Sequence, residues 1–228
     1  MIVIKSTALR RAIRRAVPFV VVPALALSGA VLTERGQYAL VISLVCAASF
    51  LLFAAGFERK KTGSRRLVVV SIMTALAVAG RFIPLVKPVA ALTIISALYL
   101  GGEAGFLTGA LTALISNFYF GQGPWTPFQM MAWGLVGLTA GLLAEPLRKK
   151  RALLLLYGAL AGIGYSMIMD VWTVLWYGQG FRLTLYLAAL VTALPHTALY
   201  AASNVLFLAL LARPFGEKLE RLRVKYGI

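Results

Sequence analysis

Residues 58–80, ERKKTGSRRLVVVSIMTALAVAG, place a run of basic side chains directly before a long apolar stretch. The same pattern recurs, because nineteen of the 23 Lys and Arg residues lie before the first apolar stretch, after the second, after the sixth or near the C-terminus. The remaining four are Arg35, Arg81, Lys87 and Arg182. Cytoplasmic loops of membrane proteins retain Lys and Arg, whereas translocated loops lose them. The sequence therefore predicts a membrane protein with both termini in the cytoplasm.

Composition supports a membrane protein and argues against other classes. The chain is 61% hydrophobic with a mean hydropathy of +0.86, whereas soluble domains are roughly 45–50% apolar. The net charge of +16 sits in short clusters at the ends of apolar stretches, where it suits anionic lipid headgroups rather than nucleic acid. Cys46 and His196 are the single cysteine and the single histidine, which excludes a disulfide framework and a multi-His metal site.

The chain divides into apolar segments of about the length of a membrane span, which is roughly 20 residues. The eight segments are 16–33, 38–57, 67–83, 89–102, 104–120, 128–147, 152–177 and 183–212. Segment 89–102 is too short to cross upright, so we expect it to be broken, to thin the bilayer or to borrow neighbouring residues. The basic and small residues around the first segment also fit a cleaved signal peptide, although we favour an uncleaved span.

These segments predict an all-α, polytopic membrane helical bundle in two parts. Residues 1–64 form a transmembrane hairpin with a basic cytoplasmic loop, and residues 65–228 form a six-helix membrane domain. Small residues recur four apart within the second part, where they let helices approach closely. These pairs are Ala75 and Ala79, Gly105 and Gly109, Gly137 and Gly141, and Gly158 and Gly162. We interpret the glycine pairs as internal packing and leave a further role open for the alanine pair.

Polar groups inside the predicted membrane domain are candidates for function, because burying them is costly. Asp170 is the only acid deep within a span, and it either serves a function or pairs with Arg81 or Arg182. His196 follows Pro195 in the last segment, where a hydrogen-bonded core histidine is the commoner case. Residues 121–129, GQGPWTPFQ, predict a rigid outer loop that could cap a planar ligand or anchor the chain at the interface.

The sequence contains no arrangement typical of a catalyst. It has no Gly-rich phosphate loop with Lys, no His and Glu at metal-ligand spacing and no nucleophile elbow. An ATPase is therefore excluded within this chain, and energised transport would need a partner that binds the nucleotide. We expect no enzyme activity and no cofactor or metal in this chain, with ATP used by partner ATPases.

Three stretches carry a resemblance to a known family. They are the helix 68–83 with Ala75, Ala79 and the outer residues RFIP, the turn 101–105 (GGEAG), and the segment 106–117 (FLTGALTALISN). The block from Arg65 onward thereby resembles the substrate-binding (S) component of an energy-coupling factor (ECF) transporter. Residues 116–127, SNFYFGQGPWTP, are similar to a subgroup associated with cobalamin uptake.

The resemblance implies a six-helix domain of the bacterial cell membrane that captures a vitamin, here cobalamin, on the outer side. It also implies partners, namely a transmembrane coupling subunit and two ATPases, with Ala75 and Ala79 contacting the coupling subunit. The hairpin departs from the six-helix pattern. For a corrinoid we expect a wide outer cavity, and the candidate substrate contacts are Arg81, Asn117, Gln122, Trp125, Phe128, Gln129, Asp170 and Trp172.

Two other functions remain open on the residues alone. A proton-coupled secondary transporter of a small organic nutrient would use Asp170. A membrane-embedded enzyme would use Asp170 together with His196.

Overall fold

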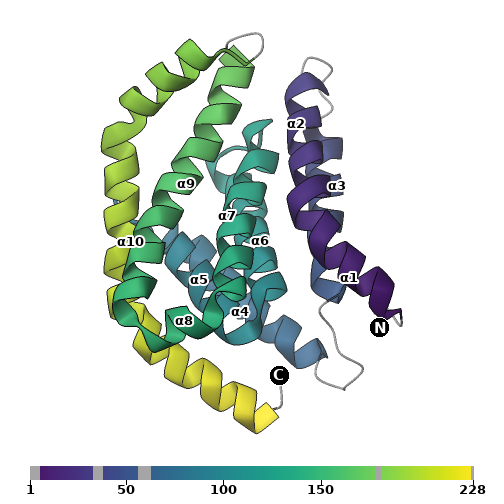
Figure 1. Ribbon diagram of the computed structural model, residues 1–228, viewed down its shortest axis with the longest axis vertical. Coiled ribbons are helices and arrows are strands. Elements are labelled where there is room, and N and C mark those ends of the chain that lie inside the picture. Colours follow the sequence, from purple (N-terminus) through teal and green to yellow (C-terminus); the bar gives the residue numbers. More distant parts are fainter. Residues whose placement is uncertain (1–5, 33–37, 56–62, 178–180, 227–228) are drawn as a thin grey trace.

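The structure is a computed structural model, which describes residues 6–32, 38–55, 63–177 and 181–226 (Figure 1). These residues form helices, with no strand among them. The helices are α1 (Thr7–Ala16), a π-helical turn (Val17–Val21), α2 (Val22–Leu32), α3 (Tyr38–Ala55), α4 (Gly63–Gly80), α5 (Val89–Leu100), α6 (Gly102–Phe120), α7 (Trp125–Leu142), α8 (Ala144–Lys149), α9 (Arg151–Tyr177) and α10 (Leu183–Tyr226). The basic residues Lys5, Arg35, Arg59, Lys60 and Lys61 lie outside the described residues.

The predicted fold class, an all-α membrane helical bundle, is confirmed. Helices α9 and α10 are each long and apolar enough to cross a membrane. The short segment forms α5, which has 12 residues, of which all but Tyr99 are buried. It packs against α4, α6, α7 and α10, so its apolar side chains face other helices rather than lipid. A helix enclosed in this way has no need to span the bilayer by itself.

Glycines bring α6 and α7 close together. A Cβ on Gly137 of α7 would overlap the backbone of Gly105 in α6, and a Cβ on Gly105 would overlap Ala97 of α5. On α9, a Cβ on Gly162 would overlap the backbone of Ala201 in α10, whereas one on Gly158 would meet the end of the Leu208 side chain. The interpretation of these glycines as internal packing residues is therefore confirmed. By contrast, Ala75 and Ala79 are exposed on α4.

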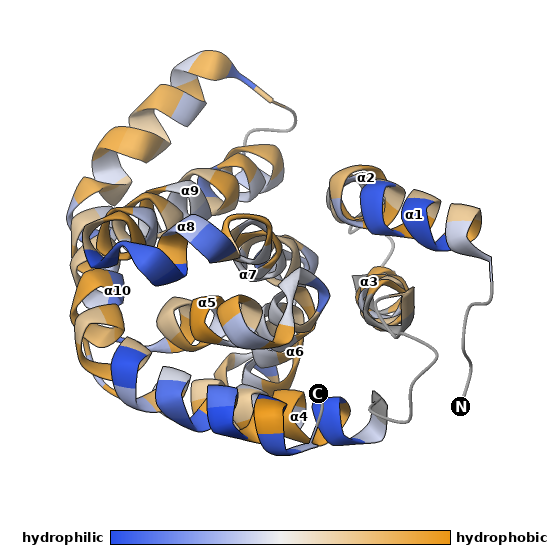
Figure 2. Cartoon of the chain, turned by 60° about the horizontal axis from the view of Figure 1, so that its bottom comes forward, coloured by the Kyte–Doolittle hydropathy of each residue, from blue (hydrophilic) through white to orange (hydrophobic). Residues whose placement is uncertain are grey.

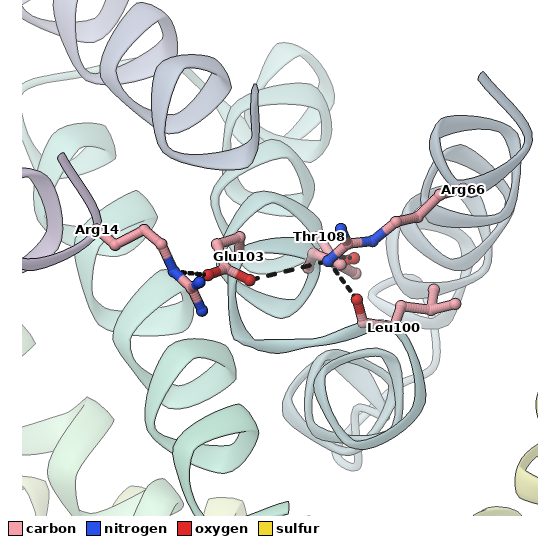
Figure 3. A network of polar contacts seen from close by, with 6 residues as sticks. Arg14, Arg66, Leu100, Glu103 and Thr108 are labelled. Carbon is pink, nitrogen blue, oxygen red and sulfur yellow. Dashed lines mark hydrogen bonds and ion pairs between the residues drawn. The ribbon is translucent and has the colours of Figure 1, made fainter. Parts of the chain in front are cut away.

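Glu103 joins the N-terminal hairpin to the rest of the bundle (Figure 3). This carboxylate is 6% exposed at the first turn of α6, and it lies 2.5 Å from Arg14 Nε of α1 and 3.8 Å from Arg66 Nη2 of α4. Arg66 also donates a hydrogen bond to the carbonyl of Leu100 at the end of α5. A buried carboxylate is stable only when it is paired, so three helices meet around one charge.

Basic residues from distant parts of the chain meet at this same end, which we call the basic end. Arg148 in α8 pairs with Glu220 near the end of α10 at 3.0 Å. Arg65 at the start of α4 donates to the carbonyl of Tyr226, at 3.4 Å. The hydrophilic colouring of α1, α8 and the end of α10 is visible in Figure 2. Basic clusters that are separated by apolar stretches in the sequence therefore lie together at one end of the folded chain.

Helix α10 is longer than its predicted segment, 183–212, because it continues for a further 14 residues to Tyr226. Figure 1 shows that this last part turns beneath the bundle. Pro214 lies inside the helix, Leu219 is 4% exposed, and Arg213 pairs with Glu217 at 3.1 Å. The apolar segment 183–212 therefore ends before the helix does, because the helix continues as an amphipathic segment.

The close contact between α6 and α7 predicts different effects for the same substitution at two glycines. At Gly109 a Cβ would overlap the backbone of Trp133, whereas at Gly164 it would meet nothing within 4 Å. We expect Gly109→Ala to destabilise the protein by roughly 1–3 kcal/mol through overpacking. We expect Gly164→Ala to be neutral or stabilising by up to about 1 kcal/mol, because alanine favours helix. Thermal unfolding of both variants in detergent measures the difference, and equal melting temperatures would contradict this packing.

Candidate functional site

Arg81 enters the bundle at the end opposite the basic end. It follows α4 directly, and its amide donates to the carbonyl of Ala77, which carries the helical turn onward. Its Nη1 donates to Ser116 Oγ and to Asn117 Oδ1, the latter at 2.5 Å. The guanidinium carbon lies 4.6 Å from the ring centre of Phe120 and 5.3 Å from that of Trp133. A cation between two aromatic faces is stabilised by their quadrupoles.

Amide groups continue the network from α6 to α7 and α9. Asn117 Nδ2 donates to Thr126 Oγ1 at 2.9 Å and to Gln129 Oε1 at 2.8 Å. Gln129 Nε2 then donates to the hydroxyl of Tyr165 at 3.0 Å. Asn117 is completely buried and Gln129 is 5% exposed, so each amide satisfies its hydrogen bonds within the protein.

Three aromatic side chains form the far side of this network. Trp133 and Tyr165 stack with their ring centres 5.3 Å apart and their planes 12° apart. Trp133 Nε1 donates to the hydroxyl of Tyr200 at 2.6 Å, and the rings of Tyr165 and Tyr200 are 4.8 Å apart. We call the whole group the Arg81 cluster, and its members are Arg81, Ser116, Asn117, Thr126, Gln129, Trp133, Tyr165 and Tyr200.

The charge of Arg81 is not neutralised by a carboxylate within the described part of the chain, where its partners are hydroxyl, amide and aromatic groups. Lys87 lies in the loop nearby, with Nζ 5.7 Å from the ring centre of Phe120. Burial, with Arg81 as a second cause, lowers the pKa of Lys87 below its ordinary value. The cluster therefore carries a positive potential that would favour an acceptor-rich or anionic ligand group.

The predicted site residues fall into distinct groups. Arg81, Asn117 and Gln129 share one hydrogen-bonded network. Gln122 borders it, because its Oε1 accepts from Thr126 Oγ1 at 3.0 Å, while its Nε2 donates to the carbonyl of Leu114 at 2.8 Å.

Phe128 is 1% exposed and belongs to the hydrophobic core. Asn117, Phe128 and Gln129 therefore lie buried inside the bundle, whereas we had expected them to line a wide outer cavity.

A second aromatic group lies beside Trp125. Its ring centre is 5.9 Å from that of Trp172, and the planes meet at 75°. Trp172 also stacks with Trp176 at 6.1 Å, and its Nε1 is buried without a hydrogen-bond partner. Trp125 and Trp172 are half-buried, so they are nearer to the surface than the Arg81 cluster.

Asp170 stands apart from both arginines that could have paired with it. Among the described residues it forms no ion pair with Arg81 or Arg182, and its buried Oδ2 has no hydrogen-bond partner. It interacts electrostatically with His196 and Tyr186. His196 itself is exposed, and its ring lies parallel to that of Tyr200 at 6.2 Å. The interpretation of Asp170 as half of a structural pair with either arginine was therefore wrong.

The loop between α6 and α7 is shorter than predicted. Residues 121–129 were expected to form a rigid loop, either as a cap over a ligand or as an interfacial anchor, but α7 begins at Trp125 and only residues 121–124 connect the helices. Proline is tolerated in the first turn of a helix, where the missing N–H needs no partner, so Pro127 does not stop α7. Trp125 and Gln129 consequently lie one turn apart on one face of α7.

Sequence reasoning missed Trp133, Tyr165 and Tyr200 as members of a site. Each lies in an apolar helix, where an aromatic side chain resembles an ordinary core residue. One usable signal was the spacing of Gln129 and Trp133, which places an amide and an indole on the same helix face.

Comparison with known proteins identifies the family. The family whose model matches is described as ECF-type riboflavin transporter, S component, and it covers residues 61–221. Among curated proteins and among solved structures none matches this chain. The predicted resemblance to an ECF S component is thus confirmed, whereas the cobalamin-type subgroup stays a prediction. The matched residues include α4 to α9 and most of α10, and they leave out α1 to α3. The chain therefore belongs to the family of ECF-type riboflavin transporter S components, which are parts of a membrane transporter rather than enzymes.

Proposed function

We propose that this chain captures a vitamin at the outer surface of the cell membrane and delivers it by docking onto an ATP-driven coupling module. The observation that carries this proposal is the Arg81 cluster in a chain of this family. The distribution of Lys and Arg supports a basic end in the cytoplasm, with the opposite end, where Arg81 lies, facing outward.

The cluster is suited to recognition of a flat, polar ring. Arg81 offers donors, Asn117 and Gln129 offer both donors and acceptors, and Trp133 and Tyr165 offer stacked faces. Binding pockets combine apolar and aromatic walls with a few placed polar groups in this way. A ligand would exchange its own hydrogen bonds for those within the cluster, so capture requires these side chains to separate.

Two candidate ligands are each supported by a different observation. Cobalamin is favoured by the resemblance of residues 116–127 to the cobalamin subgroup. Riboflavin appears in the description of the matched family, and its flat ring with acceptor edges suits the donors and stacked aromatic rings of the Arg81 cluster. The compact burial of Asn117, Phe128 and Gln129 favours the smaller ligand of the two.

A vitamin panel tests the proposed capture function. We expect the purified chain in detergent to bind one vitamin saturably, without partner subunits, because this family separates capture from the ATPases. Riboflavin, cobalamin, cobinamide, biotin and thiamine are the ligands to titrate by calorimetry. Riboflavin binding would exclude the cobalamin assignment and the reverse result would exclude riboflavin, while no binding across the panel would contradict capture by the isolated chain.

Arg81 supplies the charged donors of the site, so its removal should weaken binding selectively. We expect Arg81→Gln to raise the Kd of the bound vitamin by about 10- to 100-fold, because a charged hydrogen bond contributes roughly 1.5–3 kcal/mol. Arg182→Gln is the matched control, since this exposed arginine lies outside the cluster. Titration of both variants compares them, and equal affinity for Arg81→Gln and the unsubstituted chain would remove Arg81 from the site.

The exposed alanines of α4 support docking onto a coupling subunit. Ala75 and Ala79 line a groove of about 650 Å³ together with Val78, Leu111 and Ile115. Two small residues one turn apart allow a partner helix to approach the backbone. We propose this groove as the contact with the transmembrane coupling subunit, which is joined by two ATPases.

Filling this groove should uncouple docking from capture. We expect the double variant Ala75→Leu with Ala79→Leu to lose co-purification with the coupling subunit while its vitamin affinity is unchanged. Ala198→Leu with Ala202→Leu is the matched control, because these alanines are also exposed and four residues apart, on α10. If the α4 variant co-purified as well as the control, the groove would not be the docking surface.

A further inference from the structure

The basic end contains a cavity that the vitamin site does not explain. It has a volume of about 530 Å³ and lies between α1, the first turn of α6 and the end of α7. Glu103 forms part of its wall, and so do Gly102 and Gly141, where the backbones of α6 and α7 meet. The cavity therefore forms only because the N-terminal hairpin packs onto the six-helix domain.

Positive charge dominates the wall of this cavity. Among the described residues that line it, four are arginines of α1 (Arg10, Arg11, Arg14 and Arg15) and one, Glu103, carries a carboxylate. Glu103 is already engaged by Arg14 and by Arg66. The cavity therefore has a surplus of positive charge, and guanidinium groups match the geometry of a phosphate.

Apolar side chains form another part of the wall. Phe19 and Leu142 line it, and they are 53% and 67% exposed. Phe19 follows the arginines of α1 along the chain as it enters the predicted first span. A phosphate next to an acyl chain satisfies both parts of this wall, whereas free phosphate would leave the apolar part unused.

We propose that this cavity binds the headgroup phosphate of an anionic phospholipid of the cytoplasmic leaflet, with its acyl chain along Phe19 and Leu142. Arg11 and Arg15, which are exposed, contact the phosphate, while Arg14 is held in place by Glu103. The lipid bridges the hairpin and the six-helix domain. This site is independent of vitamin capture, because it lies at the opposite end of the bundle.

The test measures lipid selectivity on the purified full chain in detergent. Native mass spectrometry gives the affinities for dihexanoyl phosphatidylglycerol and for dihexanoyl phosphatidylcholine. We expect the anionic lipid to bind about tenfold or more tightly than the zwitterionic one, since each basic residue near a headgroup favours anionic lipid. Equal binding of the two lipids by the unsubstituted chain would overturn the proposal without any variant.

Variants then locate the site. We expect Arg11→Gln with Arg15→Gln to weaken binding of phosphatidylglycerol about tenfold or more and to leave phosphatidylcholine unchanged. Lys218→Gln with Arg221→Gln is the matched control, because it removes the same charge from exposed positions on α10. An equal loss in the control would mean that surface charge alone attracts the lipid, which overturns the proposal. Displacement of phosphatidylglycerol by millimolar inorganic phosphate would identify a free-phosphate site and overturn the assignment to lipid.

Discussion

The close backbone contact between α6 and α7 is the constraint on which the rest of the structure depends. Gly109 and Gly137 allow it, because a Cβ at Gly109 would overlap the backbone of Trp133, and a Cβ at Gly137 would overlap the backbone of Gly105. The two helices are joined by only four residues, beginning with Gly121 at a φ of +102°, a value that favours glycine. Asn117 near the end of α6 is thereby placed against Gln129 near the start of α7.

The contact between α6 and α7 determines which side chains surround Arg81. A cation inside a membrane protein is costly unless polar groups replace the lost water. Here Ser116 and Asn117 accept its hydrogen bonds, and Phe120 and Trp133 present their ring faces. Packing alone has no need for a charge at this position, because an apolar side chain would fill it without desolvation. The charge is therefore better explained by a ligand than by stability.

At the basic end, by contrast, charges of opposite sign pair with one another. Glu103 is buried between Arg14 and Arg66, and so it holds the hairpin against α4 and α6. One end of the bundle thus has its carboxylate paired, while the Arg81 cluster keeps an unneutralised cation within the described residues. In the proposed function the two ends have different tasks, namely assembly at the basic end and recognition at the other.

Much of this fold could be predicted from sequence, because long apolar stretches bounded by basic clusters leave few alternatives. The length of segment 89–102 indicated that it is too short to cross a membrane upright. Only the structure shows that α5 is enclosed by other helices. Asn117 and Gln129 could be nominated since buried amides are rare in apolar surroundings. Tyr165 and Tyr200 could not, because their hydroxyl partners lie on other helices, 36 and 67 residues away in sequence. The end of α10 also lies beyond the predicted segment 183–212, because charged residues end an apolar stretch without ending the helix.

The most direct test of the central claim is to determine which energy source drives vitamin uptake. The proposed function couples capture to a partner that uses ATP, whereas a carrier using Asp170 would need only a proton gradient. The measurement is vitamin uptake into proteoliposomes containing this chain with and without its coupling module, under ATP or a pH gradient. The account predicts uptake only with the module and ATP. Uptake by the chain alone, driven by a pH gradient and abolished by Asp170→Asn, would contradict it.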